Sequence, residues 1–248
     1  MRTVSIVLPI TRPWRMKTMA DQIFSLIVPD IQVELVLVVD NIEIPKSTIH
    51  RCFGRFPYKL HYTGLPLPSE QNLGQRRTRI ADNMNTARGM VGNSDYTFLL
   101  EDDTDIKQDY LTALIENMHS DAGIISGVQA GRHGLYHIGA WNTDDIDNPT
   151  LFETVPYSNS GLRAVDATGF YCCLLSTKLF QSTTIPCEPL PVGPDVQFGL
   201  QLRKQGYSNF IVDDLKCGHI EETRVVMPSK ECVQVRFKKT GEKWNLTK

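Results

Sequence analysis

The sequence has no long apolar run, no strong excess of charge and no C-x-x-C pair of cysteines. Its N-terminal apolar stretch ends at Arg12 and Pro13, which is too short for a membrane span or a signal-peptide core and predicts a strand. The net charge of −2 argues against a global field for nucleic acid or membranes. Because the six cysteines form no C-x-x-C pair, a reduced, cytoplasmic protein is predicted.

Two glycine-rich phosphate-binding motifs are also missing. No G-x-G-x-x-G follows the first apolar run, and no G-x-x-x-x-G-K-S/T occurs in the chain. If a nucleotide binds, its phosphates must be neutralised in another way. A divalent metal held by one or two carboxylates would do this.

The first half of the chain alternates strand-like and helix-like patterns. The predicted elements are a strand at 3–10, a helix at 16–27, strands at 33–40 and 59–64, a helix from 69 or 70 to about 91, a strand at 96–100 and a helix at 111–118. The nearly continuous apolar strands are typical of a parallel sheet covered on both faces. The pattern predicts an α/β fold in which ligands lie at the carboxyl ends of the strands, where Asp40 stands.

The second half has a different character. Its predicted elements are a strand at 122–129, a long irregular segment at 130–161, a strand–turn–strand unit at 162–180, a helix from 195 that ends at Gly206 and a strand at 208–214. Tyr136, Trp141 and Tyr157 in the irregular segment could stack on a sugar or close the core. The change near residue 125 indicates a change of role within one domain.

The last residues are basic. Residues 224–248 contain seven Lys or Arg and two Glu, and we predict a tail at 223–248 after a domain at 1–222. Such tails are usually solvated ends. Phe237 and Trp244 among the lysines could instead touch an anionic membrane surface or a nucleic-acid backbone.

Three carboxylates stand side by side directly after the strand at 96–100. Adjacent carboxylates repel one another, so either a cation or exposure to water must relieve them. In an extended segment Glu101 and Asp103 point to one side and Asp102 to the other. A solvated acidic turn is the alternative, but the cluster is expected at the same sheet edge as Asp40, which favours a metal site.

Six stretches resemble GT-A fold glycosyltransferases of the inverting, family-2-like type, and they follow one another along the chain in the order found in that family. The run DYTFLLEDDTD resembles their D-x-D segment in an E-D-D form. The other five are VSIVLPITRP for the first strand, VELVLVVDN for the second, VDATGFYCCLLSTKLF for the segment before the acceptor side, GPDVQFGLQLRKQGY for the helix with the base, and VDDLKCGHI for a late metal-binding histidine. The resemblance implies a single GT-A domain with a Rossmann-like, mostly parallel sheet, a nucleotide-sugar half at 1–125 and an acceptor and catalytic half at 126–222.

The resemblance also implies roles for individual residues. Asp195 would be the catalytic base, and Glu101, Asp103 and His219 would bind Mn²⁺ or Mg²⁺. The implied contacts to the nucleotide sugar are Pro9, Thr11, Asp40, Arg76, Arg79, Asp102, Thr168 and Gly169. Arg77 is a further candidate, but Arg76 and Arg79 are preferred because they share the polar face of their helix with Asn83. The predicted apolar row on another face of this helix is Leu73, Ile80, Met84, Ala87 and Val91. Without the resemblance, Asp195 is equally natural as a helix cap and His219 as a core or loop histidine.

The implied activity is transfer of a sugar from a nucleotide-diphosphate sugar, expected to be a UDP-sugar, to a hydroxyl of a glycan or lipid-linked glycan. A hydroxylated base in DNA is a second acceptor class. The base motif departs from the family pattern, because Pro194 and Gln197 stand where acids are usual. Two other classes therefore remain open: a nucleotidyltransferase, and a non-catalytic protein that binds sugars, nucleotides or nucleic acid.

Overall fold

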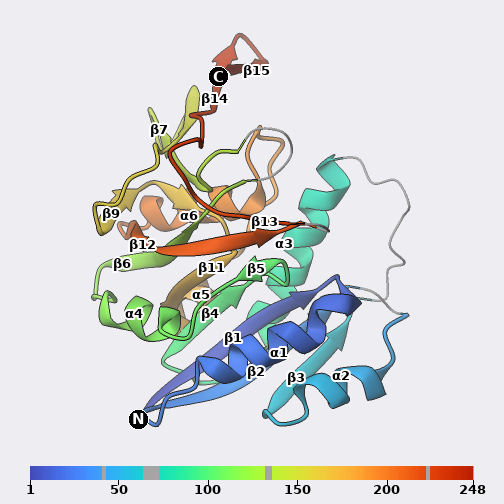
Figure 1. The fold of residues 1–248 in the computed structure, drawn as a ribbon. Coiled ribbons are helices and arrows are strands. Elements are labelled where there is room, and N and C mark those ends of the chain that lie inside the picture. The colour runs from blue at the N-terminus through green and yellow to red at the C-terminus, as the bar shows by residue number, and fades with distance from the viewer. Residues whose placement is uncertain (41–42, 64–72, 132–135, 222–223, 248) are drawn as a thin grey trace.

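The computed structural model describes residues 1–40, 43–63, 73–131, 136–221 and 224–247. Its centre is a mixed sheet with helices on both faces, and a smaller antiparallel sheet lies at one end (Figure 1). The strands of the central sheet are β1 (Arg2–Ile10), β2 (Ile31–Val39), β3 (Tyr58–Tyr62), β4 (Tyr96–Leu100), β5 (Thr104–Asp105), β6 (Ala122–Gln129), β9 (Leu162–Val165), β11 (Cys172–Ser176), β12 (Ser208–Ile220) and β13 (Val225–Val226). Their order is β3-β2-β1-β4-β11-β6-β12-β13, and β5 and β9 pair with β12.

Helices cover both faces of this sheet. They are the 3-10 turn η1 (Pro13–Arg15) and helices α1 (Met16–Ser25), α2 (Lys46–Phe53), α3 (Leu73–Met90), α4 (Tyr110–Glu116), α5 (Thr177–Ser182) and α6 (Pro194–Lys204). Side chains alternate along β1: Ile6 and Leu8 pack with α1, α2 and α4, whereas Val7 packs with α3, α5 and α6. This two-sided burial explains the continuous apolar runs. None of the described helices has both the length and the apolar character that crossing a membrane requires.

Strand β11 runs against its neighbours. The pairs β1–β2, β1–β4 and β2–β3 are parallel, as predicted, whereas β11 lies antiparallel between β4 and β6. Residue 125, where a change of role was predicted, falls inside β6. The two sides of the molecule therefore share one sheet.

The smaller sheet has the order β10-β7-β8-β14-β15. Its strands are β7 (Ala140–Thr143), β8 (Leu151–Thr154), β10 (Ala167–Thr168), β14 (Arg236–Thr240) and β15 (Lys243–Thr247). The segment predicted as irregular thus supplies β7 and β8, and the predicted tail supplies a hairpin. The ring of Phe237 lies 5.9 Å from that of Trp141, and Trp244 lies 5.3 Å from Phe152. These aromatic side chains close a core, while the lysines of the hairpin remain exposed.

Two helices differ from their predictions. The predicted start of α3 at 69 or 70 lies outside the described residues. Its predicted apolar row is partly wrong, because Leu73 is 62% and Ile80 is 40% exposed while Arg79 and Asn83 are buried at the sheet edge. Helix α5 replaces the end of a predicted strand. Its cause is a local cap, since the Ser176 hydroxyl accepts a hydrogen bond from the Leu179 amide at 3.2 Å.

Gln197 explains one departure from the family pattern. Its Oε1 accepts a hydrogen bond from the Glu188 amide at 2.6 Å, and its Nε2 donates to the carbonyls of Glu188 at 3.0 Å and Val192 at 3.3 Å. A carboxylate could accept the first bond but could not donate the other two. The side chain therefore fixes the loop that leads into α6.

We expect Gln197→Glu to lower the free energy of unfolding by about 2 kcal/mol, because a carboxylate would face two carbonyl oxygens in a buried site. Urea unfolding followed by circular dichroism measures the change. Gln201→Glu, half-buried on the same helix, is the matched control. Equal losses in both variants would contradict this role for Gln197.

Candidate active site

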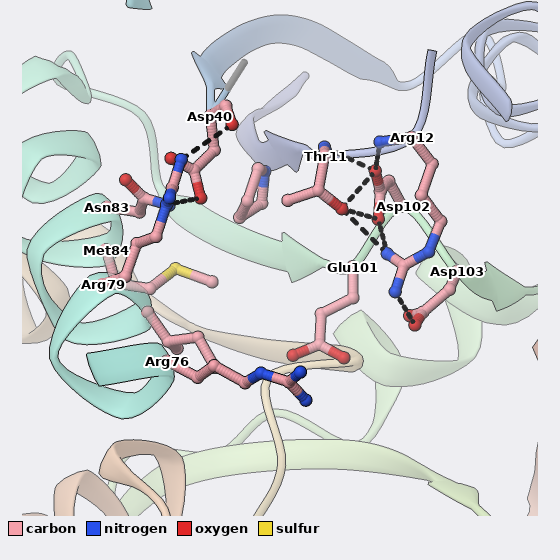
Figure 2. A pocket seen from close by; sticks show the side chains of 12 residues that line it. Thr11, Arg12, Asp40, Arg76, Arg79, Asn83, Met84, Glu101, Asp102 and Asp103 are labelled. Carbon is pink, nitrogen blue, oxygen red and sulfur yellow. Dashed lines mark hydrogen bonds and ion pairs between the residues drawn. The ribbon is translucent and has the colours of Figure 1, made fainter. Parts of the chain in front are cut away.

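A pocket of about 310 Å³ opens at the carboxyl ends of β1, β2 and β4 (Figure 2). It is lined by Pro9, Thr11, Arg12, Asp40, Arg76, Arg79, Ile80, Asn83, Met84, Glu101, Asp102 and Asp103. Every site residue predicted in the first half of the chain is in this set, apart from the further candidate Arg77. The predicted residues of the second half, which are Thr168, Gly169, Asp195 and His219, lie outside the lining.

Asp40 and Arg79 form a buried ion pair on one wall. The Asp40 carboxylate accepts hydrogen bonds from Arg79 Nε and, at 2.9 Å, from the Thr63 hydroxyl. Arg79 Nη2 also donates to the Asp40 carbonyl at 3.0 Å. Arg76, one turn earlier on α3, is exposed and extends into the pocket (Figure 2). Of the two preferred arginines, Arg79 fixes Asp40 and Arg76 is placed to meet a ligand.

Asp102 organises the turn after β1. Its Oδ2 accepts hydrogen bonds from the backbone amides of Thr11 and Arg12, each at 2.7 Å, and from the Thr11 hydroxyl at 3.1 Å. Its Oδ1 forms an ion pair with Arg12. The resemblance implied that Asp102 contacts the nucleotide sugar. Asp102 does line the pocket, and its carboxylate is bonded to the turn that carries Thr11 and Arg12.

Asp103 and His219 face each other across the β5–β12 pairing. His219 Nε2 lies 3.3 Å from Asp103 Oδ2, and the other ring nitrogen, Nδ1, lies 2.9 Å from the Ala130 carbonyl. A carbonyl can only accept, so Nδ1 carries a proton. Nε2 and the carboxylate then face each other as two acceptors unless a second proton or a cation lies between them. A nitrogen and an oxygen donor fixed in this way fit a divalent metal.

Glu101, the third predicted ligand, extends toward the middle of the pocket in Figure 2. Among the described residues, no three His, Cys, Asp or Glu side chains are grouped closely enough to hold a metal ion. A guanidinium, that of Arg12, lies instead on Asp103, with Nη2 2.8 Å from Oδ2. Burial would lower the pKa of Arg12, but the carboxylates of Asp102 and Asp103 outweigh it and raise the pKa.

Asp195 stands in the first turn of α6, and a glycine lies on each side of its carboxylate in space. A Cβ on Gly193 would lie 2.3 Å from its Oδ1, and one on Gly169 would lie 3.3 Å from its Oδ2 and 2.6 Å from the Tyr171 ring. The carboxylate therefore fits only because Gly193 and Gly169 have no side chain. Burial raises the pKa of Asp195, and the amides of Val196 and Asp195 and the charge of Arg77 partly offset this. A raised pKa suits a carboxylate that takes up a proton.

The pocket and Asp195 are joined through the residues that lead into β11. The Glu101 amide donates to the Tyr171 carbonyl at 3.3 Å, and Gly169, two residues before Tyr171, lies against Asp195. Thr168 is buried with its hydroxyl 3.0 Å from the Tyr171 hydroxyl. We therefore assign Thr168 to the support of Tyr171, whereas the sequence analysis expected it to contact the nucleotide sugar.

Arg77 has a role that the sequence did not indicate. Its two terminal nitrogens donate to the carbonyls of Leu190 and Pro191, each at 2.5 Å, in the loop before α6. Its charge also lowers the pKa of Asp195. The only hint in the sequence was that Arg77 directly follows Arg76 in the helix, so that its side chain leaves α3 on a different side. Gly193 was likewise missed, although it directly precedes Pro194 and Asp195.

We expect Arg77→Gln to move the acid limb of the pH–activity profile to higher pH. Removing the positive charge raises the pKa of Asp195 further, so a higher pH is needed to keep the carboxylate ionised. The profile of kcat against pH measures this shift. Arg88→Gln, farther along α3, is the control and should leave the limb in place; a limb unmoved by Arg77→Gln would contradict the coupling.

The mixed α/β fold is of the GT-A class, as the resemblance implied, because it matches solved glycosyltransferase structures of that class. No protein-family model and no curated protein sequence matches the chain. Several solved structures do match it in fold, although their sequences are only 13–15% identical to it.

Three of these structures illustrate the match. GalNAc-T7, with UDP, GalNAc and Mn²⁺, is 14% identical over 89% of this chain and 44% of its own, with a TM-score of 0.59. The mannosyltransferase PcManGT from Pyrobaculum calidifontis, with GDP-Man and Mn²⁺, is 13% identical over 84% and 55%, with a TM-score of 0.54. S. aureus TarS 1–349, with UDP-GlcNAc, is 15% identical over 86% and 55%, with a TM-score of 0.52. The chain thus spans about half the length of each of these proteins.

Proposed function

We propose that this chain is a metal-dependent, inverting glycosyltransferase that moves a sugar from a UDP-sugar to a hydroxyl of a glycan or lipid-linked glycan. The observation that carries the proposal is one sheet edge that holds both the acid-lined pocket and, through β11, the carboxylate of Asp195. The solved structures with the same fold support it, since they contain UDP, UDP-GlcNAc or GDP-Man, two of them with Mn²⁺.

In this proposal the pocket binds the nucleotide and its diphosphate. Arg76 would contact the phosphates, and the Asp40–Arg79 pair would shape the wall for the base and ribose. Asp103 and His219, with Glu101, would hold Mn²⁺ or Mg²⁺. When bound, such an ion supplies positive charge that stabilises the leaving diphosphate.

Asp195 would act on the acceptor. Its carboxylate would accept the proton of the acceptor hydroxyl as that oxygen attacks the anomeric carbon and the bond to the diphosphate breaks. A single displacement of this kind inverts the anomeric centre. Gly169 and Gly193 allow the carboxylate to take this position, since a Cβ at either would crowd it.

A cytoplasmic location remains part of the proposal. All six cysteines are free, and Cys172, Cys173 and Cys217 are buried. This pattern fits a reducing compartment.

Nucleotide release tests the function. The purified chain is incubated with UDP- and GDP-sugars, with Mn²⁺ or with a chelator, and the released nucleoside diphosphate is measured. Slow hydrolysis without an acceptor is sufficient for the assay. We expect release of UDP from one UDP-sugar, lost with chelator. Release of pyrophosphate from a nucleoside triphosphate and a sugar phosphate would instead identify a nucleotidyltransferase. If the chain shows no turnover and binds no nucleotide, the proposal is refuted.

A further inference from the structure

Arg12 places one guanidinium against two acids at the floor of the pocket. It forms an ion pair with Asp102 Oδ1, and its Nη2 lies 2.8 Å from Asp103 Oδ2. The Arg12 side chain is 25% exposed, whereas those of the two acids are 5% and 4% exposed. The guanidinium is therefore the accessible partner of two buried carboxylates, and Figure 2 shows it between them.

The same Asp103 oxygen faces His219. Oδ2 lies 2.8 Å from Arg12 Nη2 and 3.3 Å from His219 Nε2. A divalent ion held between Asp103 and His219 would need this oxygen. A guanidinium within hydrogen-bond distance of it would repel the ion strongly in a partly buried site.

We infer that Arg12 is an internal counter-cation, which holds Asp103 in place when no metal is bound and competes with the metal for its carboxylate. The inference rests on the proposed function, because it takes Asp103 and His219 as metal ligands. The backbone of Arg12 is anchored separately, since its amide donates to Asp102 Oδ2 at 2.7 Å. Only the Arg12 side chain has to move when a metal ion replaces its guanidinium at Asp103.

A diphosphate bound in the pocket would give the displaced guanidinium of Arg12 a second partner. Arg12 and Arg76 line the same cavity, and a guanidinium matches the paired oxygens of a diphosphate. Metal binding would thus free a cation for the nucleotide, and the nucleotide would draw that cation away from Asp103. By linkage, each of the two ligands should increase the affinity for the other.

Mn²⁺ binding without nucleotide tests the inference. The free Mn²⁺ signal in electron paramagnetic resonance gives the Kd for wild type, Arg12→Gln and Arg76→Gln. We expect Arg12→Gln to tighten Mn²⁺ binding at least about fivefold, the lower end of typical coupling between sites. Arg76→Gln removes a cation from the same pocket and should change the Kd less than about twofold, because Arg76 is exposed and its charge is screened by water and salt.

The opposite result is equally clear. Unchanged or weaker Mn²⁺ binding in Arg12→Gln, with wild-type circular dichroism and melting, would overturn the inference. If Arg12→Gln does not fold, Arg12→Lys replaces it. A lysine cannot bridge both carboxylates, so this variant should show a smaller gain of the same sign, and no gain would overturn the inference.

Two further measurements separate this inference from the proposed function. UDP binding should weaken in Arg12→Gln, because the cation that would meet the diphosphate is gone. Tighter Mn²⁺ binding in this variant, when the wild type neither turns over nor binds any donor nucleotide, would uphold the counter-cation and refute the transferase. Turnover that resists chelator, with no Mn²⁺ bound by any variant, would overturn the counter-cation and the metal dependence but leave sugar transfer itself standing.

Discussion

Asp195→Asn should lower kcat by about 10²–10⁴-fold, the range that a positioned general base contributes. An asparagine has the size of the aspartate and can keep its place between Gly169 and Gly193, but its amide cannot accept a proton at neutral pH. Asp195 does not line the pocket proposed for the nucleotide, so the affinity for the donor should be nearly unchanged. Steady-state transfer kinetics and calorimetric titration with the nucleotide measure the two quantities.

The control for this variant is Glu188→Gln. Glu188 is exposed in the loop before α6, so its substitution removes one negative charge near the site without altering the base. A loss confined to Asp195→Asn assigns the effect to proton transfer. If Asp195→Asn keeps wild-type activity, the carboxylate is a helix cap only, and the alternative of a non-catalytic binding protein gains support.

Asp103→Asn should reduce turnover by about 10²–10³-fold, as expected when a charged stabiliser of the leaving group is lost. The amide keeps the shape of the carboxylate and an acceptor for Arg12, but it removes the negative charge that would hold a cation beside His219. Mn²⁺ affinity and nucleotide release should fall together. His219→Ala should act in the same direction, because it removes the nitrogen donor.

Asp105→Asn is the matched control for Asp103→Asn. Asp105 follows two residues later, is half-buried and accepts a hydrogen bond from Gln22 on α1. Removing its charge tests whether the effect depends on position or only on the total charge of the segment. Activity that survives both Asp103→Asn and chelator would show that Asp103 is not a metal ligand and that its buried carboxylate only pairs with Arg12 and His219.

The pocket was predictable because its parts follow simple rules. The strands β1, β2 and β4 are nearly continuous apolar runs, and polar residues begin directly where they end, at Thr11, Asp40 and Glu101. Parallel strands bring such positions to one edge. The predicted face of α3 with Arg76, Arg79 and Asn83 also lines the pocket. The roles of these residues in binding and catalysis stay predictions.

Other features depend on contacts that no local pattern shows. Arg77 binds carbonyls more than a hundred residues away, and only the docking of α3 against the loop before α6 selects it over its neighbours. The hairpin of β14 and β15 reads as a charged segment, yet Phe237 and Trp244 find partners on β7 and β8. Asp102 was assigned to the ligand because its partners lie on the loop after β1, far from it in sequence.

Strand β11 has one more consequence, for the way the molecule comes apart. It forms hydrogen bonds with β4 on one side and β6 on the other, so the main-chain ladder passes without interruption from the strands that carry the pocket to those of the second half of the chain. The two sides therefore belong to one cooperative unit, and local opening at either weakens the other. Neither is a module that could be excised or exchanged between proteins: a substitution that loosens β11 would disturb Glu101 and Asp195 at once.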